Sequence, residues 1–215
     1  MSKEKIFIIG DIHGCLDMLK KLIHKIAWNP LNDRLIFIGD YIDRGEDIKS
    51  VIDFILELKN ESPLVECLIG NHEKMFLDYL TGDDIESSIL NGGLSTIRSY
   101  KKCKKNEGDQ LVPQSHLSFF YSLLPMIELE EYYLVHAGFR PCIKVKEQSL
   151  NDMIWIRDEF IYSDYDFGKV VIFGHTPFDK PLIMNNKVGI DTGAVFGNRL
   201  TCLELPEKKF HYVEQ

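Results

Sequence analysis

The sequence predicts an α/β fold in which two mixed β-sheets pack face to face and are flanked by helices. Three observations predict this fold: strand-like and helix-like segments alternate over the first 70 residues, residues 73–123 are helical in pieces, and the chain after Pro125 is rich in strand-like segments. A strand–helix–strand–helix–strand order implies parallel pairing with right-handed crossovers. The 215 residues are expected to form a single domain, 1–215, in which the 73–123 segment covers the strand ends as a helical cap.

The opening unit consists of short apolar runs that alternate with amphipathic segments. Each strand-like run is rich in apolar residues and ends in glycine, and each helix-like run repeats apolar residues at three- and four-residue spacing. The predicted strands are 5–10 (KIFIIG), 34–39 (RLIFIG) and 65–70 (VECLIG), and the predicted helices are 15–26 and 48–58.

The remaining two thirds of the chain change from helical to extended patterns. The charged stretch 101–110 (KKCKKNEGDQ) separates two helical pieces and is expected to be an exposed loop. Short alternating runs after residue 125 predict a hairpin, a buried strand and closing antiparallel strands. The predicted helical pieces are 73–80, 87–100 and 115–124, and the predicted strands are 126–129, 132–138, 169–177, 185–193 and 199–214.

Composition narrows the class of protein. The net charge of -8 argues against non-specific binding to nucleic acid or to an anionic membrane, although a metal in the site would still allow an anionic substrate. The five cysteines are widely spread and form no CxxC pair, so reduced thiols and a cytoplasmic protein are expected. The apolar run near the start is too short for a signal peptide or a membrane span.

Polar residues that can bind a metal or move a proton follow five of the predicted strands. Each single case is ordinary turn chemistry, but five such cases together are not explained that way. The carboxyl ends of strands form the ligand crevice of an open α/β sheet, so these side chains are expected to converge. The residues are Asp11, His13, Asp40, Asp43, Arg44, Asn71, His72, Glu73, His136 and His175.

The types of residue in this set favour a metal centre. Four of the seven histidines lie at these strand ends, whereas His24, His116 and His211 are expected to be structural or solvated. Two Asp, three His and one Asn form a ligand set without sulfur, which suits manganese, iron or zinc. Six ligands exceed one tetrahedral site, and a bridging carboxylate allows two metals about 3.5–4 Å apart.

The motifs GDIHG, GDYIDRG, GNHE, HAG and GHT occur in this order over residues 10–176. This ordered set resembles the phosphoprotein-phosphatase type of metallophosphoesterase. The LNGG and IDTGAVF segments are similar to those of bacterial and lambda-type phage serine/threonine phosphatases. Symmetrical diadenosine tetraphosphatases share the same motif set. The resemblance implies a sandwich of two mixed sheets with metals at one edge.

The resemblance also implies a role for each metal-binding side chain. Two divalent metal ions are expected, with manganese as the first expectation and iron or zinc as alternatives. The implied ligands are Asp11 and His13 for one metal, Asp40 as the bridge to both, and Asn71, His136 and His175 for the second.

Four further residues take implied roles in binding and chemistry. Arg44 and Arg157 would clamp the phosphate, and the alternative for Arg157, which lies in a shorter motif, is a surface ion pair. His72 would be the general acid and Asp43 would orient it, because a carboxylate beside an imidazole fixes the orientation of the ring.

Three functions are consistent with these residues to different degrees. The expected function is dephosphorylation of phosphoserine and phosphothreonine in a protein or peptide by a monomeric enzyme, with no nucleic acid or membrane partner. The alternative is symmetrical hydrolysis of diadenosine tetraphosphate, which would require basic and aromatic residues around the site for two nucleosides. A catalytically silent scaffold is disfavoured because the complete set of ligands and the acid pair are present.

Two smaller features leave two interpretations each. Asn91, Gly92 and Gly93 either place a loop near the site or only join two helical pieces. Asp191 either supports a metal-binding histidine or forms a turn before Gly193.

Overall fold

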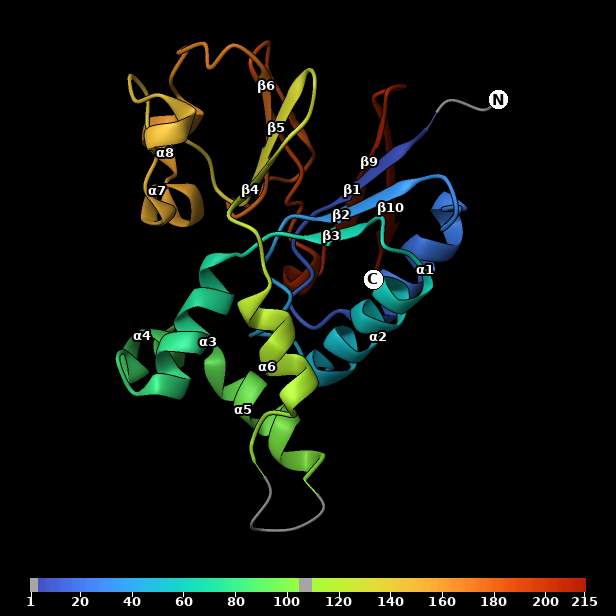
Figure 1. The fold of residues 1–215 in the computed structure, drawn as a ribbon, viewed down its shortest axis with the longest axis vertical. Coiled ribbons are helices and arrows are strands. Elements are labelled where there is room, and N and C mark those ends of the chain that lie inside the picture. Colours follow the sequence, from blue (N-terminus) through green and yellow to red (C-terminus); the bar gives the residue numbers. More distant parts are fainter. Residues whose placement is uncertain (1–3, 105–109) are drawn as a thin grey trace.

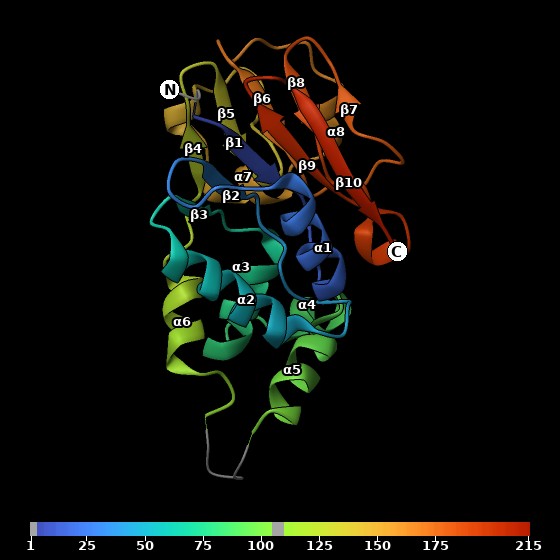
Figure 2. The same cartoon turned by 90° about the vertical axis from the view of Figure 1, so that its right-hand side faces the viewer.

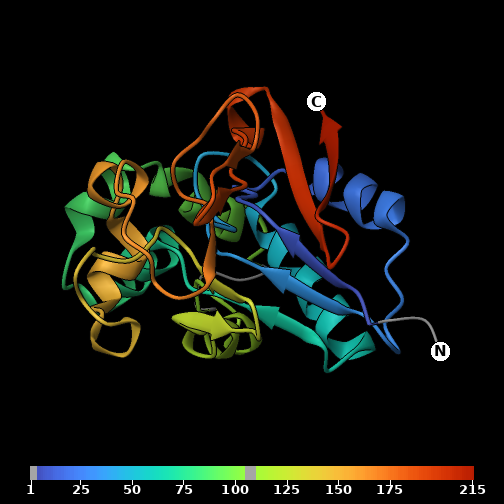
Figure 3. The same ribbon diagram turned by 90° about the horizontal axis from the view of Figure 1, so that it is seen from above.

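The computed structural model describes residues 4–104 and 110–215. In this part of the chain two five-stranded sheets lie against each other, with helices on both outer faces (Figures 1, 2 and 3). Helices α3 to α6 lie together below the sheets in Figure 1. The expected fold of two mixed sheets flanked by helices is confirmed.

The elements have the following bounds. The helices are α1 (Leu16–Ile26), α2 (Ile48–Glu61), α3 (Asn71–Thr81), α4 (Ile85–Leu90), α5 (Gly93–Lys102), α6 (Gln114–Tyr121), α7 (Leu150–Trp155) and α8 (Asp158–Ile161), with 3-10 turns η1 (Val145–Glu147) and η2 (Ala194–Phe196). The strands are β1 (Ile6–Ile9), β2 (Arg34–Phe37), β3 (Val65–Cys67), β4 (Met126–Glu128), β5 (Tyr132–Val135), β6 (Val170–Phe173), β7 (Leu182–Ile183), β8 (Lys187–Gly189), β9 (Arg199–Leu205) and β10 (Lys209–Glu214).

The two sheets combine parallel and antiparallel pairs. The first has the order β10-β9-β1-β2-β3, in which β1, β2 and β3 are parallel and β9 is antiparallel to β1. The second has the order β4-β5-β6-β8-β7, in which β5, β6 and β8 are parallel. The carboxyl ends of β1, β2, β3, β5 and β6 therefore carry the segments that the sequence predicts to converge.

Alternating side chains of the strands build three apolar clusters between four layers. Phe7 and Ile9 of β1 pack against α1 and α2, whereas Ile8 between them faces the second sheet. On the second sheet, Leu134 belongs to the cluster between the sheets, and Val135 and Phe173 belong to the cluster with α7 and α8. Burial on both faces explains why the strand sequences are apolar throughout.

Several boundaries differ from those predicted. The first three strands end one, two and three residues before their predicted ends, because the chain turns at or before the glycines that close these runs. The closing segment 185–193 was expected to be antiparallel, but β8 pairs in parallel with β6 and is antiparallel only to β7. The helices α7 and α8 have six and four residues, too few to give a helical period in the sequence.

Two further expectations concern the charged loop and membrane-spanning segments. Of the predicted loop 101–110, residues 101–103 and 110 are exposed, and residues 105–109 lie outside the described residues. Within residues 4–104 and 110–215, no helix has the length and apolar character needed to cross a membrane.

Candidate metal centre and active site

The predicted side chains from the five strand ends meet in one buried place. Asp11 and His13 come from the turn after β1, Asp40 from the turn after β2, His136 from the residue after β5, and His175 from the turn after β6. All five side chains are buried, as are Asp43, Asn71 and His72. Residues more than 160 positions apart in the sequence therefore share one edge of the sandwich, as the topology predicts.

The backbone at this edge adopts unusual conformations. Five site residues have positive φ: His13, Asp40, Asp43, Arg44 and His175. Positive φ is uncommon for residues other than glycine and clusters at functional sites. The tight turns that it creates bring side chains to the centre of the site.

Close approach of these turns also requires glycine at their ends. A Cβ atom on Gly70 would lie 2.2 Å from Asp40 Oδ1, and one on Gly174 would lie 2.1 Å from Asp11 Oδ1. The glycines that precede the site residues therefore leave room for carboxylates rather than merely ending strands.

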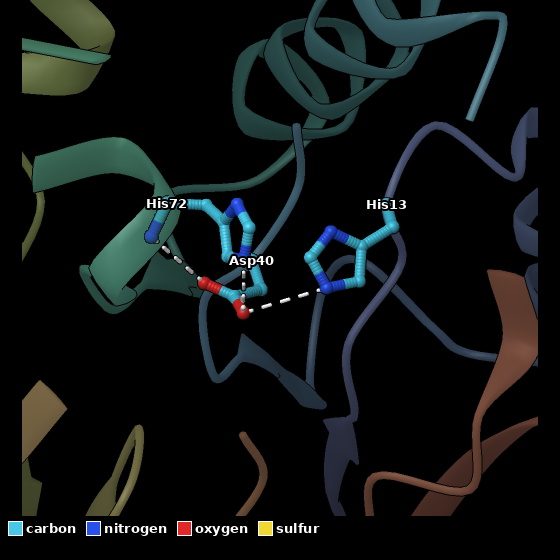
Figure 4. A group of neighbouring side chains, drawn as sticks. All are labelled: His13, Asp40 and His72. Atoms are coloured by element: carbon cyan, nitrogen blue, oxygen red, sulfur yellow. Dashed lines mark hydrogen bonds and ion pairs between the residues drawn. The ribbon is translucent and has the colours of Figure 1, made fainter. Parts of the chain in front are cut away.

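A first group of possible metal ligands consists of His13, Asp40 and His72 (Figure 4). The Nδ1 atom of His13 lies 2.7 Å from the carbonyl oxygen of Ile42, which can only accept, so Nδ1 carries the hydrogen and Nε2 offers its lone pair. This Nε2 lies 3.4 Å from Asp40 Oδ2, and His72 Nε2 lies 3.8 Å from the same oxygen.

A second group shares Asp40 and adds His136 and His175. His136 donates from Nδ1 to the carbonyl oxygen of Ile38 at 2.9 Å, which directs its Nε2 towards Asp40 Oδ1 at 3.3 Å and Asn71 Oδ1 at 3.1 Å. Asp40 belongs to both groups, which is consistent with its predicted role as a bridging ligand.

The chemistry of this donor set fits two divalent cations. The buried Nε2 atoms of His72 and His175 have no hydrogen-bond partner among the described residues, which is unusual for buried polar atoms and fits a site that holds a ligand. Burial and the neighbouring His136 lower the pKa of His175 to about 2, which keeps its imidazole neutral and able to bind a metal. Although burial opposes it, His136 and His72 hold the pKa of Asp40 well below its usual range.

Asp11 lies at the edge of these two groups. Its carboxylate accepts the backbone N–H of His175 at 3.0 Å, which ties the turn after β1 to the turn after β6. Burial, together with the nearby Asp191, raises the pKa of Asp11 well above its ordinary value. A buried carboxylate that is not compensated by a positive charge is expensive, and a cation would supply that charge.

His72 and Asp43 form the pair that the sequence predicts as an acid and its orienting group. His72 Nδ1 lies 2.6 Å from Asp43 Oδ2, and the hydroxyl of Thr96 donates to Asp43 Oδ1 at 2.5 Å. Thr96 Oγ1 also accepts the backbone N–H of Asp43 at 3.0 Å. Asp43 is therefore fixed on both oxygens, and the imidazole is held with Nε2 towards Asp40.

The two predicted phosphate-binding arginines lie on different sides of the site. Arg44 donates from Nη1 to His13 Nε2 at 2.6 Å, and its guanidinium lies 5.5 Å from the ring centre of Phe196. Arg157 donates from Nη1 to the hydroxyl of Thr176, the residue after His175, at 3.1 Å. This hydrogen bond places Arg157 beside the turn that carries His175.

The structure also bears on the two features that the sequence leaves with two interpretations each, the segment 91–93 and Asp191. The carbonyl of Gly92 lies 3.4 Å from the backbone nitrogen of Arg44, so the loop between α4 and α5 both joins helices and touches the site. Asp191 accepts the backbone N–H of Gly193 at 2.9 Å, which is the turn interpretation, and it is buried beside Asp11.

Comparison with known proteins assigns the family. Residues 4–211 match the model of the calcineurin-like phosphoesterases. The chain belongs to this family. Membership confirms the resemblance to metallophosphoesterases, and together with the histidine and aspartate groups it makes the chain a metal-dependent phosphoesterase.

Individual relatives of this calcineurin-like phosphoesterase carry different names. It is 31% identical to an asymmetrical bis(5'-nucleosyl)-tetraphosphatase, PrpE, of Oceanobacillus iheyensis, over 96% of this chain and 90% of that protein. A crystal structure assigned as a diadenosine tetraphosphatase superimposes with a TM-score of 0.78 at 19% identity, covering 99% of this chain and 94% of that one. A serine/threonine phosphatase from Saccharomyces cerevisiae superimposes with a TM-score of 0.70 at 14% identity, covering 99% and 80%.

Three residues of this phosphoesterase site, Thr96, Trp155 and Phe196, were given no role from the sequence, and the packing of α5, α7 and η2 against the site reveals them. Glu73 was predicted to join the strand-end residues, but its role was not. Its carboxylate accepts backbone N–H groups of Asp40 at 2.9 Å and Tyr41 at 2.8 Å.

Proposed function

We propose that this phosphoesterase hydrolyses bis(5'-nucleosyl) tetraphosphates, cleaving them asymmetrically. The observation that carries the proposal is the 31% identity to an enzyme named for this reaction, over 96% of this chain and 90% of that enzyme. The sequence favoured phosphoserine and phosphothreonine and named the symmetrical dinucleotide reaction as the alternative. The proposal therefore replaces the first expectation and changes the cleavage position of the second.

Aromatic side chains at the rim of the site support a nucleotide substrate. Phe196 is 65% exposed, and the turn that carries it is bracketed by Gly193 and Gly197, both with positive φ. This turn holds the Phe196 ring beside Arg44. An exposed aromatic ring beside a guanidinium group can stack a base while the arginine binds a phosphate, which is the kind of contact that the dinucleotide alternative required.

The residues of the chain take defined parts in the reaction. Divalent cations held by His13, Asp40, His136 and His175 would lower the pKa of a water molecule and stabilise charge on phosphoryl oxygens, and His72 would not be a ligand. Arg44 and Arg157 offer planar forks of N–H donors to the nonbridging oxygens. His72 Nε2, fixed through Asp43, is placed to give its proton to the leaving oxygen.

The acid pair favours a second candidate, the dephosphorylation of phosphoserine or phosphothreonine. An alkoxide is a poor leaving group and requires a proton, whereas a phosphate leaving group departs largely without one. The buried His72–Asp43–Thr96 arrangement is therefore more useful to an ester substrate than to an anhydride substrate.

A product assay with added manganese separates these functions. Asymmetric cleavage of diadenosine tetraphosphate gives a nucleoside triphosphate and a monophosphate, whereas symmetrical cleavage gives two diphosphates. We expect the asymmetric pair on anion-exchange chromatography, with higher kcat/KM than for a phosphoserine peptide. Two diphosphates would support the symmetrical alternative, and faster release of phosphate from the peptide would support the protein phosphatase. The Asp40→Asn variant, assayed in parallel, controls for contaminating hydrolases.

A further inference from the structure

A groove of about 410 Å³ opens beside the second ligand group. One wall is α7, which ends in Trp155, and the other consists of α3 and α4. Figure 1 shows α7 above α3 and α4 on the same side of the molecule. We propose that this groove binds one nucleobase of the substrate, with Trp155 as its stacking surface; this inference rests on the proposed function.

Both walls of the groove include residues that lie close to candidate metal ligands. The ring of Trp155 packs edge-on against His175, with 5.9 Å between ring centres. Met75 lines the opposite wall and lies four residues after Asn71 in α3, so both side chains project from one face of the helix, one turn apart. The groove is therefore next to the metal centre, within reach of one end of an extended substrate.

Trp155 is held in place while part of its ring stays accessible. The backbone N–H of Ala137, the residue after His136, donates to the carbonyl of Met153 at 2.7 Å. This bond ties α7 to the segment that carries a metal ligand. Trp155 is 36% exposed although its neighbours Met153 and Ile154 are buried. A large aromatic ring that is fixed and partly exposed at the edge of a site is the usual platform for a nucleobase.

The charges of the groove favour a neutral group over a phosphate. The charged residues that line the groove are Lys74, Asp78 and Asp84. Lys74 pairs with Asp78 at 2.6 Å, so the carboxylate of Asp84, at the start of α4, gives the groove its net negative charge. A polyphosphate chain would be repelled there, whereas the exocyclic amino group of a base can donate to a carboxylate. The phosphates would therefore stay with Arg157 and the cations while the base occupies the groove.

The shape of the groove also favours a base over an extended peptide. Its walls are helices, whose backbone hydrogen bonds are already made within each helix. An extended peptide is normally recognised by pairing with a free strand edge, and no strand lines this groove.

The test compares variants on substrates with and without a base. Trp155→Leu should raise KM for diadenosine tetraphosphate at least about tenfold more than KM for inorganic tripolyphosphate, since stacking contributes only with the former. Trp155→Phe, which keeps an aromatic ring, should recover most of that difference. Trp28→Phe is the matched control, because Trp28 lies near the start of β2, at the opposite end of the strand from the site.

A binding measurement separates this inference from the proposed function. The chain has two tryptophans, so Trp28→Phe leaves the fluorescence of Trp155 alone, which ATP should quench and tripolyphosphate should not. If the dinucleotide is not hydrolysed but ATP still quenches Trp155, the proposed function fails and the groove assignment stands. Equal losses on both substrates in Trp155→Leu, or an equal rise in KM for a phosphoserine peptide, would overturn the inference, because Trp155 would then only support His175 or contact peptides.

Discussion

Replacing His72 with asparagine should impair the enzyme in proportion to how much its leaving group requires a proton. The asparagine amide can still reach Asp43 from the position of Nδ1, where the imidazole bonds at 2.6 Å. The backbone N–H of residue 72, which donates to Asp40 Oδ1 at 3.2 Å, is unaffected. The substitution therefore removes Nε2, the proton donor, and leaves the surrounding hydrogen bonds largely in place.

The size of the effect follows from what a placed acid contributes. General acid catalysis accelerates a reaction by about 10²–10⁴-fold, so kcat on a phosphoserine peptide should fall by that factor. On p-nitrophenyl phosphate, whose leaving group departs readily without a proton, kcat should fall less than about tenfold. The dinucleotide, with a phosphate leaving group, should lie near the second value.

Steady-state kinetics on a series of aryl and alkyl phosphates would measure this dependence directly, with metal content determined on the same samples. The slope of log kcat against the pKa of the leaving group should be steeper for His72→Asn than for the unchanged enzyme. Parallel slopes for the two enzymes would refute the role of His72 as the general acid. A loss of bound metal in the variant would instead make His72 a ligand, a possibility raised by its 3.8 Å separation from Asp40 Oδ2.

Three further changes test one glycine at the site and two buried polar side chains away from it. Gly70→Ala would place a Cβ 2.2 Å from Asp40 Oδ1, so elemental analysis should find less than half of the metal that the matched Gly82→Asn variant retains; full metal content would contradict the close approach. Burial lowers the pKa of His116. As the pH drops below about 6.5, the unfolded chain therefore takes up a proton that the folded chain does not, and stability falls. His116→Gln should flatten this fall of Tm between about pH 7 and 5, and an unchanged profile would exclude His116 as its source. Lys187 is buried and donates to three backbone carbonyl oxygens at and just after the end of α8. Lys187→Met should therefore lower the free energy of unfolding, measured in urea, by about 2–4 kcal/mol. A loss below about 1 kcal/mol would mean that water replaces the ammonium group as the donor to these carbonyls.

The groups of candidate metal ligands could be predicted from the sequence because the order and direction of the strands largely determine which residues come together. Once β1, β2, β5 and β6 are parallel strands of a sandwich, the residues after them must share one edge, whatever the rotamers are. His13, Asp40 and His175 are therefore found from strand ends alone.

The partners outside the strand ends could not be predicted in this way. Thr96 lies 53 residues from Asp43 in α5, and only the packing of that helix brings its hydroxyl to the carboxylate. Trp155 ends a helix of six residues, too short to show a period, so neither the helix nor its contact with His175 leaves a pattern in the sequence. Contacts that depend on tertiary packing leave no local signal.

The left-handed backbone at His13, Asp40, Asp43, Arg44 and His175 has a consequence for engineering this enzyme. At each position a side chain to which we assign a part in hydrolysis occupies a conformation that glycine adopts at lower free energy, by about 1 kcal/mol. A library selected only for heat resistance would therefore accumulate glycines there and yield robust proteins without activity. Directed evolution of this scaffold must score turnover and stability in the same round.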